Sequence, residues 1–502
     1  MPAARVQGDS RIGGAFIEPF EPFAFDPSQL FINNIQGAWY DPSDNATMFQ
    51  DAAGTTPVTA VEQPVGRILD KSGRGNHATQ STAASRPVLR ARYNLLTYSE
   101  QFDNAAWFKE GGAISADSTL SPDGTTTADT WTASATNNRH AMLGGAGSGF
   151  TSVANADYVF SAYVKKGTHN YVSLLVTNNL TTWFVATFDL SGSTPVMSQS
   201  GAGAGGTFVS SSVESAANGF WRLSIRGRKT DAVVVPEIAL SPSATPTYGN
   251  YGETNWAAAG TETIVIWGAQ LLTAADAAAT GNAYQRIFDS ATYATGGVFR
   301  PYLAFDGVDD RLQTASTNIA SNAVSLFAGH SIQTAGGWGS IVTSGAAGGG
   351  GVFLMISDTT GAAAYQNVRS EGTLGSQVNS STFAYPYLDV WTMQAQISTD
   401  TLIARRNGAQ TATSSSDQGS GSYASNIMYV GSYNGANWHY PGRIYGLIVR
   451  GAASTNTEVS DTEQWLAGKT GLVFGSLFPL LLIGQLIFSS PANSGQILTL
   501  GL

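Results

Sequence analysis

The sequence predicts an all-β chain built from β-sandwiches, and three observations support this expectation. Apolar and polar residues alternate with a period of two in many segments, and glycine-containing turns separate these segments, as antiparallel sandwich strands require. Charged residues make up only 12% of the chain, about half the usual share, while glycine reaches 57 residues. Aromatic residues stand at 11%, which a disordered chain would not carry.

Composition also excludes several classes of protein. A chain of 502 residues is too long for one core, so we expect roughly two to four domains. The net charge of -10 argues against a nucleic-acid partner, which needs a basic surface. Cysteine is absent, which excludes disulfides, thiolate chemistry and cysteine-type zinc sites. Residues Met1 to Asp9 contain no apolar core of a secretory signal.

Residues 1–36 are rich in both phenylalanine and proline. Proline at this density excludes a helix or a central strand. We predict an extended arm for assembly, which either places its aromatic rings in another subunit or packs on its own chain. The aromatic residues are Phe16, Phe20, Phe23, Phe25 and Phe31, interleaved with Pro19, Pro22 and Pro27.

Residues 37–92 carry the first family resemblance. A short strand from Gly37 to Tyr40 runs into an Asp-Pro turn, and a later strand leads into the polar turn from Asp70 to His77. Together with the Arg86-Pro87 step, these motifs resemble the opening of the laminin-G-like, concanavalin A-like lectin domains found in many phage structural proteins. That fold needs two full sheets, which this segment is too short to supply.

The missing strands are expected after residue 298. The motif from Phe305 to Asp310 resembles a strand and turn of the same family, and Gly442 to Val449 resembles its late core strand. Both Thr455 to Glu458 and Ser460 to Glu463 fit a capping box, so we predict one short helix around 456–467. The resemblance therefore implies a discontinuous laminin-G-like lectin sandwich of residues 37–92 plus 298–472. Further strands are expected at 325–328, 352–356, 391–397 and 427–431.

Residues 93–287 are predicted to form an inserted domain. The motif from Asn94 to Trp107 resembles a jelly-roll module that is common in phage tail proteins and is described as carbohydrate-binding-like. Independently of that resemblance, alternation places four apolar residues on one face of a strand at 158–164, and Ala274 to Ala279 is expected to be a short helix. The predicted fold is thus a concanavalin A-like β-sandwich with a second jelly-roll β-sandwich inserted. The four residues are Tyr158, Phe160, Ala162 and Val164.

Residues 473–502 are predicted to form an apolar C-terminal assembly segment. The apolar run at 477–488 is shorter than the ~20 residues that span a bilayer, and Pro479, Gly484 and Gln485 interrupt it. We expect a buried strand pair or a contact between copies of the chain, because an exposed apolar tail is normally covered by a partner. The sequence therefore predicts a homo-oligomer without a membrane span.

The sequence shows no pattern of an active site. Sandwich enzymes that cut glycans place two carboxylates close together, usually as Glu-x-Asp-x-Glu on one strand, and this chain has no such triplet. We therefore expect no enzyme and no catalytic residue; the cluster Asp306, Asp309 and Asp310 is the nearest candidate. Isolated glutamates stand at Glu253, Glu262 and Glu371, helix-capping ones at Glu458 and Glu463, and the scattered histidines are His77, His140, His169, His330 and His439.

Calcium is the candidate cofactor. Laminin-G-like sandwiches often hold this ion with aspartate side chains and loop carbonyls, as a hard cation requires. Asp70 and Asn76 lie in one motif turn and Asp306 and Asp309 in the other, so these four are the candidate metal ligands. Capping of the turns by the same side chains is the favoured alternative.

Aromatic residues in polar or glycine-rich surroundings are the candidates for glycan binding, because sugar C–H faces stack on flat rings. Trp256, Trp338, Trp438 and Tyr440 meet this description. A loop tryptophan that packs over the edge of a sandwich is the alternative for each. Four other tryptophans lie in apolar strands and are expected in the core: Trp131, Trp183, Trp221 and Trp267.

The resemblances imply a bacteriophage virion structural protein, most simply a tail fibre or appendage subunit with lectin-like domains for attachment to host-surface glycans. A head fibre or capsid decoration protein, a glycan depolymerase and a purely structural adaptor are the alternatives. The implied partners are other virion proteins, copies of the same chain and a host glycan. The implied location is the virion, after assembly in the bacterial cytoplasm.

Overall fold

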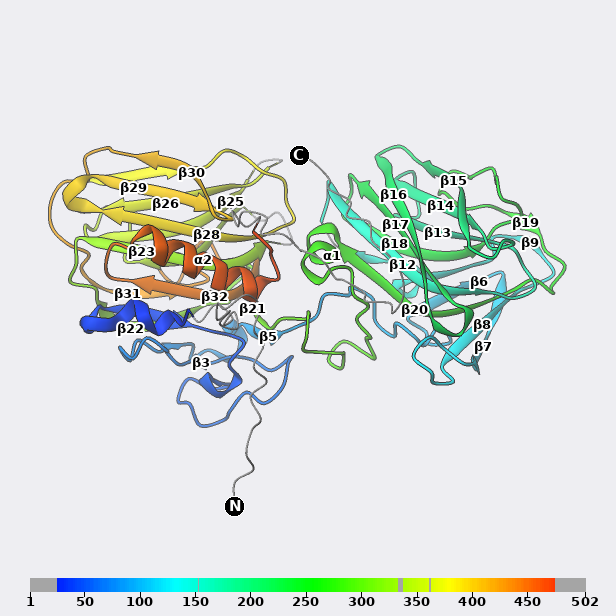
Figure 1. The fold of residues 1–502 in the computed structure, drawn as a ribbon, viewed down its shortest axis with the longest axis horizontal. Helices are drawn as coiled ribbons and strands as arrows, with labels where there is room; N and C mark the ends of the chain where they lie inside the picture. The colour runs from blue at the N-terminus through cyan, green and yellow to red at the C-terminus, as the bar shows by residue number, and fades with distance from the viewer. Residues whose placement is uncertain (1–24, 152, 333–336, 361–362, 475–502) are drawn as a thin grey trace, which may run out of the picture.

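The computed structural model describes residues 25–474 except 152, 333–336 and 361–362, and it contains two β-sandwiches side by side (Figure 1). We call them the outer sandwich and the insert. The insert consists of strands β6 to β20, and the outer sandwich takes its strands from both sides of that segment. The predicted fold class, one sandwich inserted into another, is confirmed.

The outer sandwich has two antiparallel sheets. The first runs in the order β30 (Ala409–Ser414), β29 (Thr401–Arg406), β28 (Tyr387–Gln396), β23 (Ala323–Ile332), β32 (Gly442–Arg450), β21 (Tyr302–Ala304) and β5 (Val88–Arg90), and β1 (Gly37–Tyr40) also pairs with β32. The second runs in the order β2 (Met48–Phe49), β3 (Arg67–Ile68), β4 (Ala78–Thr79), β22 (Leu312–Asn318), β31 (Ser425–Val430), β24 (Gly337–Ser344), β25 (Val352–Thr359), β26 (Tyr365–Glu371) and β27 (Gly375–Asn379).

The insert has two antiparallel sheets of its own and a small strand pair. One sheet runs in the order β15 (Val196–Ala202), β14 (Trp183–Asp189), β13 (Tyr171–Thr177), β18 (Val233–Leu240), β10 (Ala141–Gly144) and β6 (Trp107–Glu110), with β11 (Phe150–Thr151) on β18. The other runs β16 (Gly206–Ser215), β17 (Trp221–Lys229), β12 (Ala156–Lys166), β20 (Thr263–Thr273), β8 (Ala128–Ala133) and β7 (Gly112–Thr119), and the pair is β19 (Trp256–Ala257) with β9 (Asn137–Asn138).

Strands from before and after the insert complete the same sheets. Gly37 of β1 lies opposite Arg450 of β32, and Arg90 of β5 lies opposite Tyr302 of β21. In the second sheet, β4 pairs with β22. The chain therefore leaves the outer sandwich after β5 and re-enters it at β21, so that two segments distant in sequence build one core.

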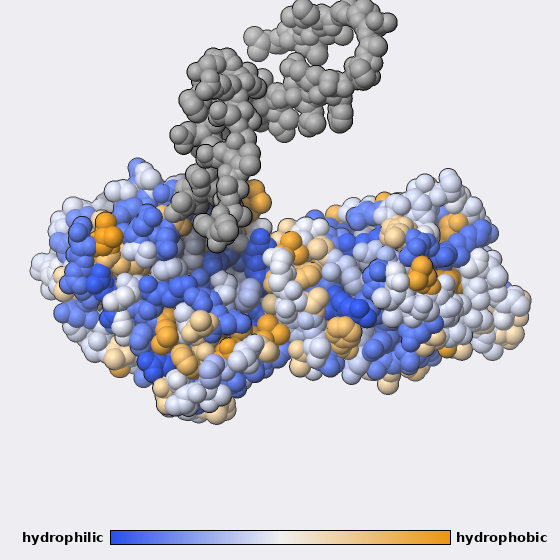
Figure 2. All heavy atoms as spheres, turned by 60° about the horizontal axis from the view of Figure 1, so that its bottom comes forward, coloured by the Kyte–Doolittle hydropathy of each residue, from blue (hydrophilic) through white to orange (hydrophobic). Residues whose placement is uncertain are grey.

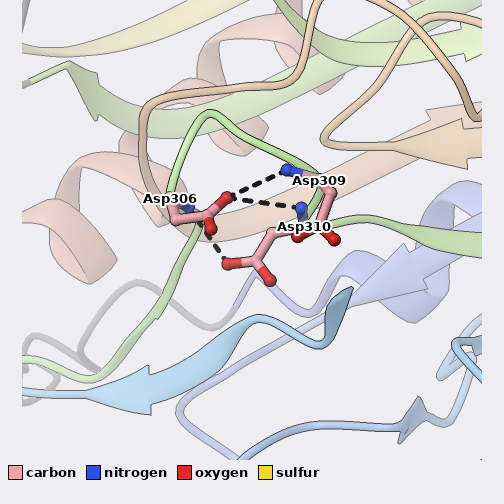
Figure 3. A group of neighbouring side chains, drawn as sticks. All are labelled: Asp306, Asp309 and Asp310. Carbon is pink, nitrogen blue, oxygen red and sulfur yellow. Dashed lines mark hydrogen bonds between the residues drawn. The ribbon is translucent and has the colours of Figure 1, made fainter. Parts of the chain in front are cut away.

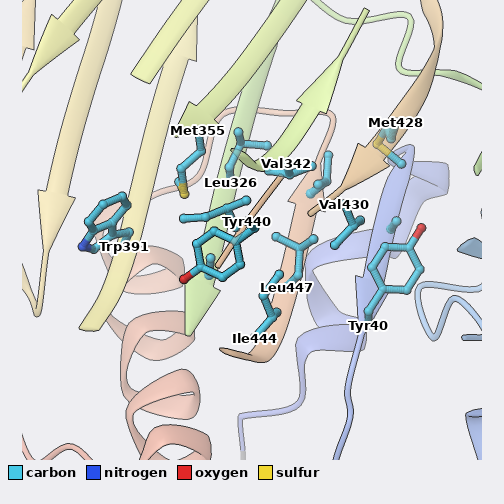
Figure 4. Close-up of a cluster of buried hydrophobic side chains, with 14 of the residues drawn as sticks. Tyr40, Leu326, Val342, Met355, Trp391, Met428, Val430, Tyr440, Ile444 and Leu447 are labelled. Atoms are coloured by element: carbon cyan, nitrogen blue, oxygen red, sulfur yellow. The ribbon is translucent and has the colours of Figure 1, made fainter. Parts of the chain in front are cut away.

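Each sandwich has its own hydrophobic core. In the outer sandwich, Tyr40 from before the insert packs in one cluster with residues from after it, such as Trp391 and Leu447 (Figure 4). In the insert, the strand face predicted from alternation is fully buried from Tyr158 to Val164. Of the tryptophans expected in the core, Trp131, Trp183 and Trp267 are buried, and Trp221 is half-buried.

In the described part of the chain, two α-helices accompany the sheets. Helix α1 (Ala274–Thr280) follows β20, as predicted, and helix α2 (Asn456–Thr470) starts at the capping box of Thr455 and Glu458. The prediction of a second capping box at Ser460 to Glu463 was wrong. Glu463 lies inside α2, where it is buried and pairs with Arg405 at 2.8 Å, because a helix that has already begun leaves no free amide for it to cap.

The described part of the N-terminal arm packs on its own chain. The 3-10 segment η1 (Pro27–Asn34) buries Leu30 and Phe31 in a cluster with Trp39 and Leu466 of α2. Phe16, Phe20 and Phe23, and the apolar run at 477–488, lie outside the described residues. Shorter 3-10 turns are η2 (Asn45–Thr47), η3 (Ala83–Ser85), η4 (Gly145–Gly147), η5 (Ala217–Gly219) and η6 (Ile397–Thr399).

The surface shows no dominant apolar area in the view of Figure 2, where hydrophobic residues are scattered in small groups over both sandwiches. Scattered apolar residues of this kind are normal on a protein surface. None of the helices in the described part of the chain has the length and hydropathy to cross a bilayer.

Candidate functional site

Three aromatic rings gather where strand β24 begins and the loop after β31 passes beside it. Trp338 at the start of β24 stacks on Trp438 with ring centroids 5.3 Å apart and planes inclined by 29°. Tyr433 lies 4.3 Å from Trp438 at 31°. Trp438 is 38% exposed, and the other two are half-buried. We call Trp338, Tyr433 and Trp438 the aromatic platform.

Backbone hydrogen bonds fix the loop that carries the platform. The Tyr433 amide donates to the Asn437 carbonyl at 2.7 Å, and the Ser340 amide of β24 donates to the Trp438 carbonyl at 2.8 Å. Trp438 has a φ of 49°, in the left-handed region that a bulky side chain rarely adopts. Such a conformation costs about 1–3 kcal/mol and persists only where its surroundings enforce it. The ring of Trp438 is therefore held at the surface by a structured loop.

Tyr440 does not belong to the platform, so its prediction as a glycan-binding residue was wrong. Its side chain is 0% exposed and lies in the core of the outer sandwich (Figure 4). The hydroxyl donates to the Ser331 carbonyl at 2.9 Å and lies 2.7 Å from Nδ1 of His330. Burial lowers the pKa of His330 to about 3, so this ring is neutral. The chain turns inward after Trp438 to enter β32, and the next aromatic side chain joins the core.

Trp256 belongs to the insert and not to the platform. It lies in the short strand β19, half-buried, and its ring stacks on His169 at 5.4 Å and 18°. His140 meets it edge-on at 5.0 Å. The two histidines therefore pack against the Trp256 ring. This matches the alternative left open by the sequence, a tryptophan that packs over the edge of a sandwich.

An acidic turn lies beside the platform loop. Asp306, Asp309 and Asp310 each offer a carboxylate oxygen, and these oxygens lie within 4.8 Å of one another (Figure 3). Asp306 also accepts the amides of residues 308, 309 and 310, which is the capping role expected of such a turn. Gly307 of this turn lies against Pro441, which follows the platform. These three carboxylates have the ligand type that calcium prefers.

The other predicted calcium ligands are occupied elsewhere. Asp70 is buried, and its oxygens accept the amides of Trp39, Ser72 and Asn76. The Asn76 side chain donates to the Gly37 carbonyl at 2.7 Å. Asp70 does not belong to the cluster of three carboxylates in the acidic turn, so the four predicted ligands do not form one site. Asp310, which the metal prediction omitted, joins Asp306 and Asp309 in the acidic turn.

The acidic turn is expected to make the stability of the protein depend on pH. Burial, together with the charges of Asp306 and Asp309, raises the pKa of Asp310 from 3.8 to about 6. Between these two values the folded state holds a proton that the unfolded state has released, so this group makes stability fall as the pH rises from about 4 to 6. We expect Asp310→Asn to remove about 1–2 kcal/mol of that fall in urea titrations across this range. Wild-type and variant curves that stay parallel would contradict this assignment.

Sequence reasoning missed a polar pocket in the insert. A cavity of about 370 Å³ is lined by Glu100, Asp103, Asp117, Arg286 and Phe288, among others. Burial raises the pKa of Glu100 to about 7, although Arg286 lies 2.8 Å from it and opposes that rise. The Arg286 guanidinium stacks over Phe288 at 4.5 Å. The only signal in the sequence was a charged residue, Glu100, within the motif from Asn94 to Trp107.

Comparison with known proteins identifies no family. No protein-family model matches the sequence, and no curated protein does. A solved structure of the Ruminococcus gnavus IT-sialidase CBM40 bound to alpha2,3 sialyllactose is 14% identical, and the match covers 29% of this chain and 84% of that one with a TM-score of 0.24. A botulinum neurotoxin type C structure is 10% identical over 34% of this chain and 44% of that one, with a TM-score of 0.27. A leech intramolecular trans-sialidase is 15% identical over 31% and 24%, with a TM-score of 0.23. Likenesses this weak carry no argument about function.

Proposed function

We propose that this chain is a lectin-like attachment protein that binds a glycan on the aromatic platform. The observation that carries the proposal is the stack of half-buried Trp338 on exposed Trp438, brought together from two segments distant in sequence. Flat exposed rings attract the C–H faces of sugars, and a loop that is rigid before binding reduces the entropy lost on binding. Polar side chains belong to or adjoin the same loop: Asn437 is exposed, and Arg311 lies against Gly435.

The proposed biological setting is a bacteriophage virion. It rests on the sequence motifs from Arg86 to Trp107 and from Phe305 to Asp310, which resemble phage structural modules. We place the chain in a tail fibre or another appendage, located on the virion after assembly in the bacterial cytoplasm. We also propose binding without cleavage, and steady release of reducing ends from host polysaccharide would contradict that part.

Removal of a platform ring tests the glycan proposal. On a glycan array and on host cells, we expect Trp438→Ala and Trp338→Ala each to weaken binding by at least about tenfold, equivalent to about 1.4 kcal/mol. Trp256→Ala is the matched control, because it removes a half-buried tryptophan from the insert and leaves the platform intact. An equal loss in the control, or full binding by Trp438→Ala, would contradict the proposal.

Self-association is proposed from the apolar C-terminal run at 477–488. Apolar segments of this kind are normally covered by a partner, and a second copy of the chain is the simplest partner. We expect removal of residues 475–502 to lower the mass measured by light scattering. A mass that the truncation leaves unchanged would contradict the proposal that this run holds copies of the chain together.

A further inference from the structure

A cleft lies where the two sandwiches join. Its cavity has a volume of about 720 Å³, and both parts of the molecule line it. Glu62, Arg90 and Arg443 come from the outer sandwich, Arg92 lies in the link between β5 and the insert, and Phe150 lies in the insert. A cavity of this volume falls in the range of small-molecule sites, and the junction between two domains is a frequent place for them.

Arg90, Arg92 and Arg443 line the cleft, and Glu62 is the one carboxylate among the residues that line it. Arg90 pairs with Glu62 at 2.9 Å, and the other oxygen of Glu62 accepts the hydroxyl of Tyr293. Arg443 pairs with Asp276 at 2.7 Å. Within the described residues, Arg92 forms no direct ion pair, although the carboxylates of Glu62 and Asp289 lie near enough to act on its charge.

The chain holds the Arg92 guanidinium in a fixed position. It donates to the carbonyls of Asn94, Leu95 and Leu96 at 3.0–3.1 Å, and the Tyr302 hydroxyl donates to the Arg92 carbonyl at 2.6 Å. Burial lowers the pKa of Arg92, which shows that water solvates its charge poorly. An arginine stays charged even so, and carbonyl dipoles supply no full negative charge. An anion that entered the cleft would meet a fixed and partly desolvated cation.

We propose that this cleft binds the carboxylate of an acidic sugar, with the carboxylate facing Arg92. The cavity is far larger than a bare anion and leaves room for a ring beside the charge. The half-buried ring of Phe150 and the Thr97 side chain supply an apolar surface and a hydroxyl beside it. Backbone carbonyls take the Nε and Nη2 donors of Arg92, so the carboxylate would pair with the donors of Nη1. This site is separate from the aromatic platform and does not depend on the function proposed there.

The test uses the full chain and two sugars that differ in one group. Methyl glucuronide carries a carboxylate where methyl glucoside carries a hydroxymethyl group. In titrations followed by ligand-observed NMR, we expect the glucuronide to bind at least about tenfold more tightly, and its affinity to fall as salt is added. Equal binding of the two sugars would overturn the proposal. Displacement of the glucuronide by equimolar inorganic phosphate would also overturn it, because it would reveal a site for bare anions.

A matched pair of variants at Ala291 locates the site. This exposed residue lines the cleft, and the hydrogen bond of its backbone amide to Asp289 does not involve its side chain. Ala291→Glu adds a negative charge and is expected to weaken glucuronide binding at least about tenfold, whereas Ala291→Gln, similar in size but neutral, should change it less than about twofold. Glucuronide binding that survives in Ala291→Glu but is lost in Trp438→Ala would place the sugar on the platform and overturn the cleft assignment.

Discussion

Replacement of Arg443 by methionine is expected to lower the free energy of unfolding by about 3–5 kcal/mol, the usual cost of removing one partner from a buried ion pair. Arg443 lies in β32 of the outer sandwich, and Asp276 lies in α1 at the end of the insert. Their side chains are 10% and 1% exposed, and their charged atoms are 2.7 Å apart. The guanidinium also lies 4.7 Å from the ring centre of Tyr302. The variant leaves the Asp276 carboxylate buried without a cation, and urea unfolding measures the loss.

Two further variants identify the ion pair as the cause. Arg226→Met breaks the exposed pair with Asp157 and should cost less than about 1 kcal/mol. The double variant Arg443→Met with Asp276→Leu removes both charges and should recover most of the loss, because no unpaired charge stays buried. If Arg443→Met alone cost as little as Arg226→Met, the junction between the sandwiches would not be as tightly packed as the structure indicates.

The second large effect is expected for Trp391→Ala, which should destabilise the outer sandwich by about 3–5 kcal/mol. Trp391 is 0% exposed and stacks on Tyr387 at 5.7 Å, while His330 meets its ring edge-on at 4.3 Å. His330 in turn contacts the Tyr440 hydroxyl, two residues beyond Trp438 of the platform. The cavity left by the missing indole should therefore also loosen the platform loop.

A matched variant in the other core separates the two sandwiches. Trp131 of the insert is equally buried, and Trp131→Ala should have a similar cost. In scanning calorimetry we expect Trp391→Ala to lower the unfolding transition of the outer sandwich and Trp131→Ala that of the insert. Identical effects of both variants on every transition would contradict the description of two separate cores.

Local patterns in the sequence predicted local structure well. Alternation over 158–164 identified the buried face of β12, because a strand with one face in the core must alternate. Thr455 and Glu458 identified the start of α2, because a helix start leaves amides that only such side chains satisfy. The family motifs on both sides of the insert predicted which strands complete one sandwich.

Contacts between distant segments could not be predicted from those patterns. Trp338 and Trp438 meet because β24 pairs with β31, which places the loop after β31 beside the start of β24. The left-handed residue Trp438 interrupts the alternation, so the sequence could not show that Tyr440 turns into the core. The cleft at the junction depends on how the two sandwiches join, and no local pattern in the sequence encodes that arrangement.

Fluorine NMR of the chain with fluorinated tryptophan tests the central claim most directly. The chain contains 11 tryptophans, and the variants Trp338→Phe and Trp438→Phe assign the two platform signals. When a neutral oligosaccharide that the protein binds is added, we predict that these two signals shift and that the buried tryptophans such as Trp131 and Trp391 do not. Saturable binding that leaves both platform signals unchanged would contradict the assignment of the platform as the glycan site.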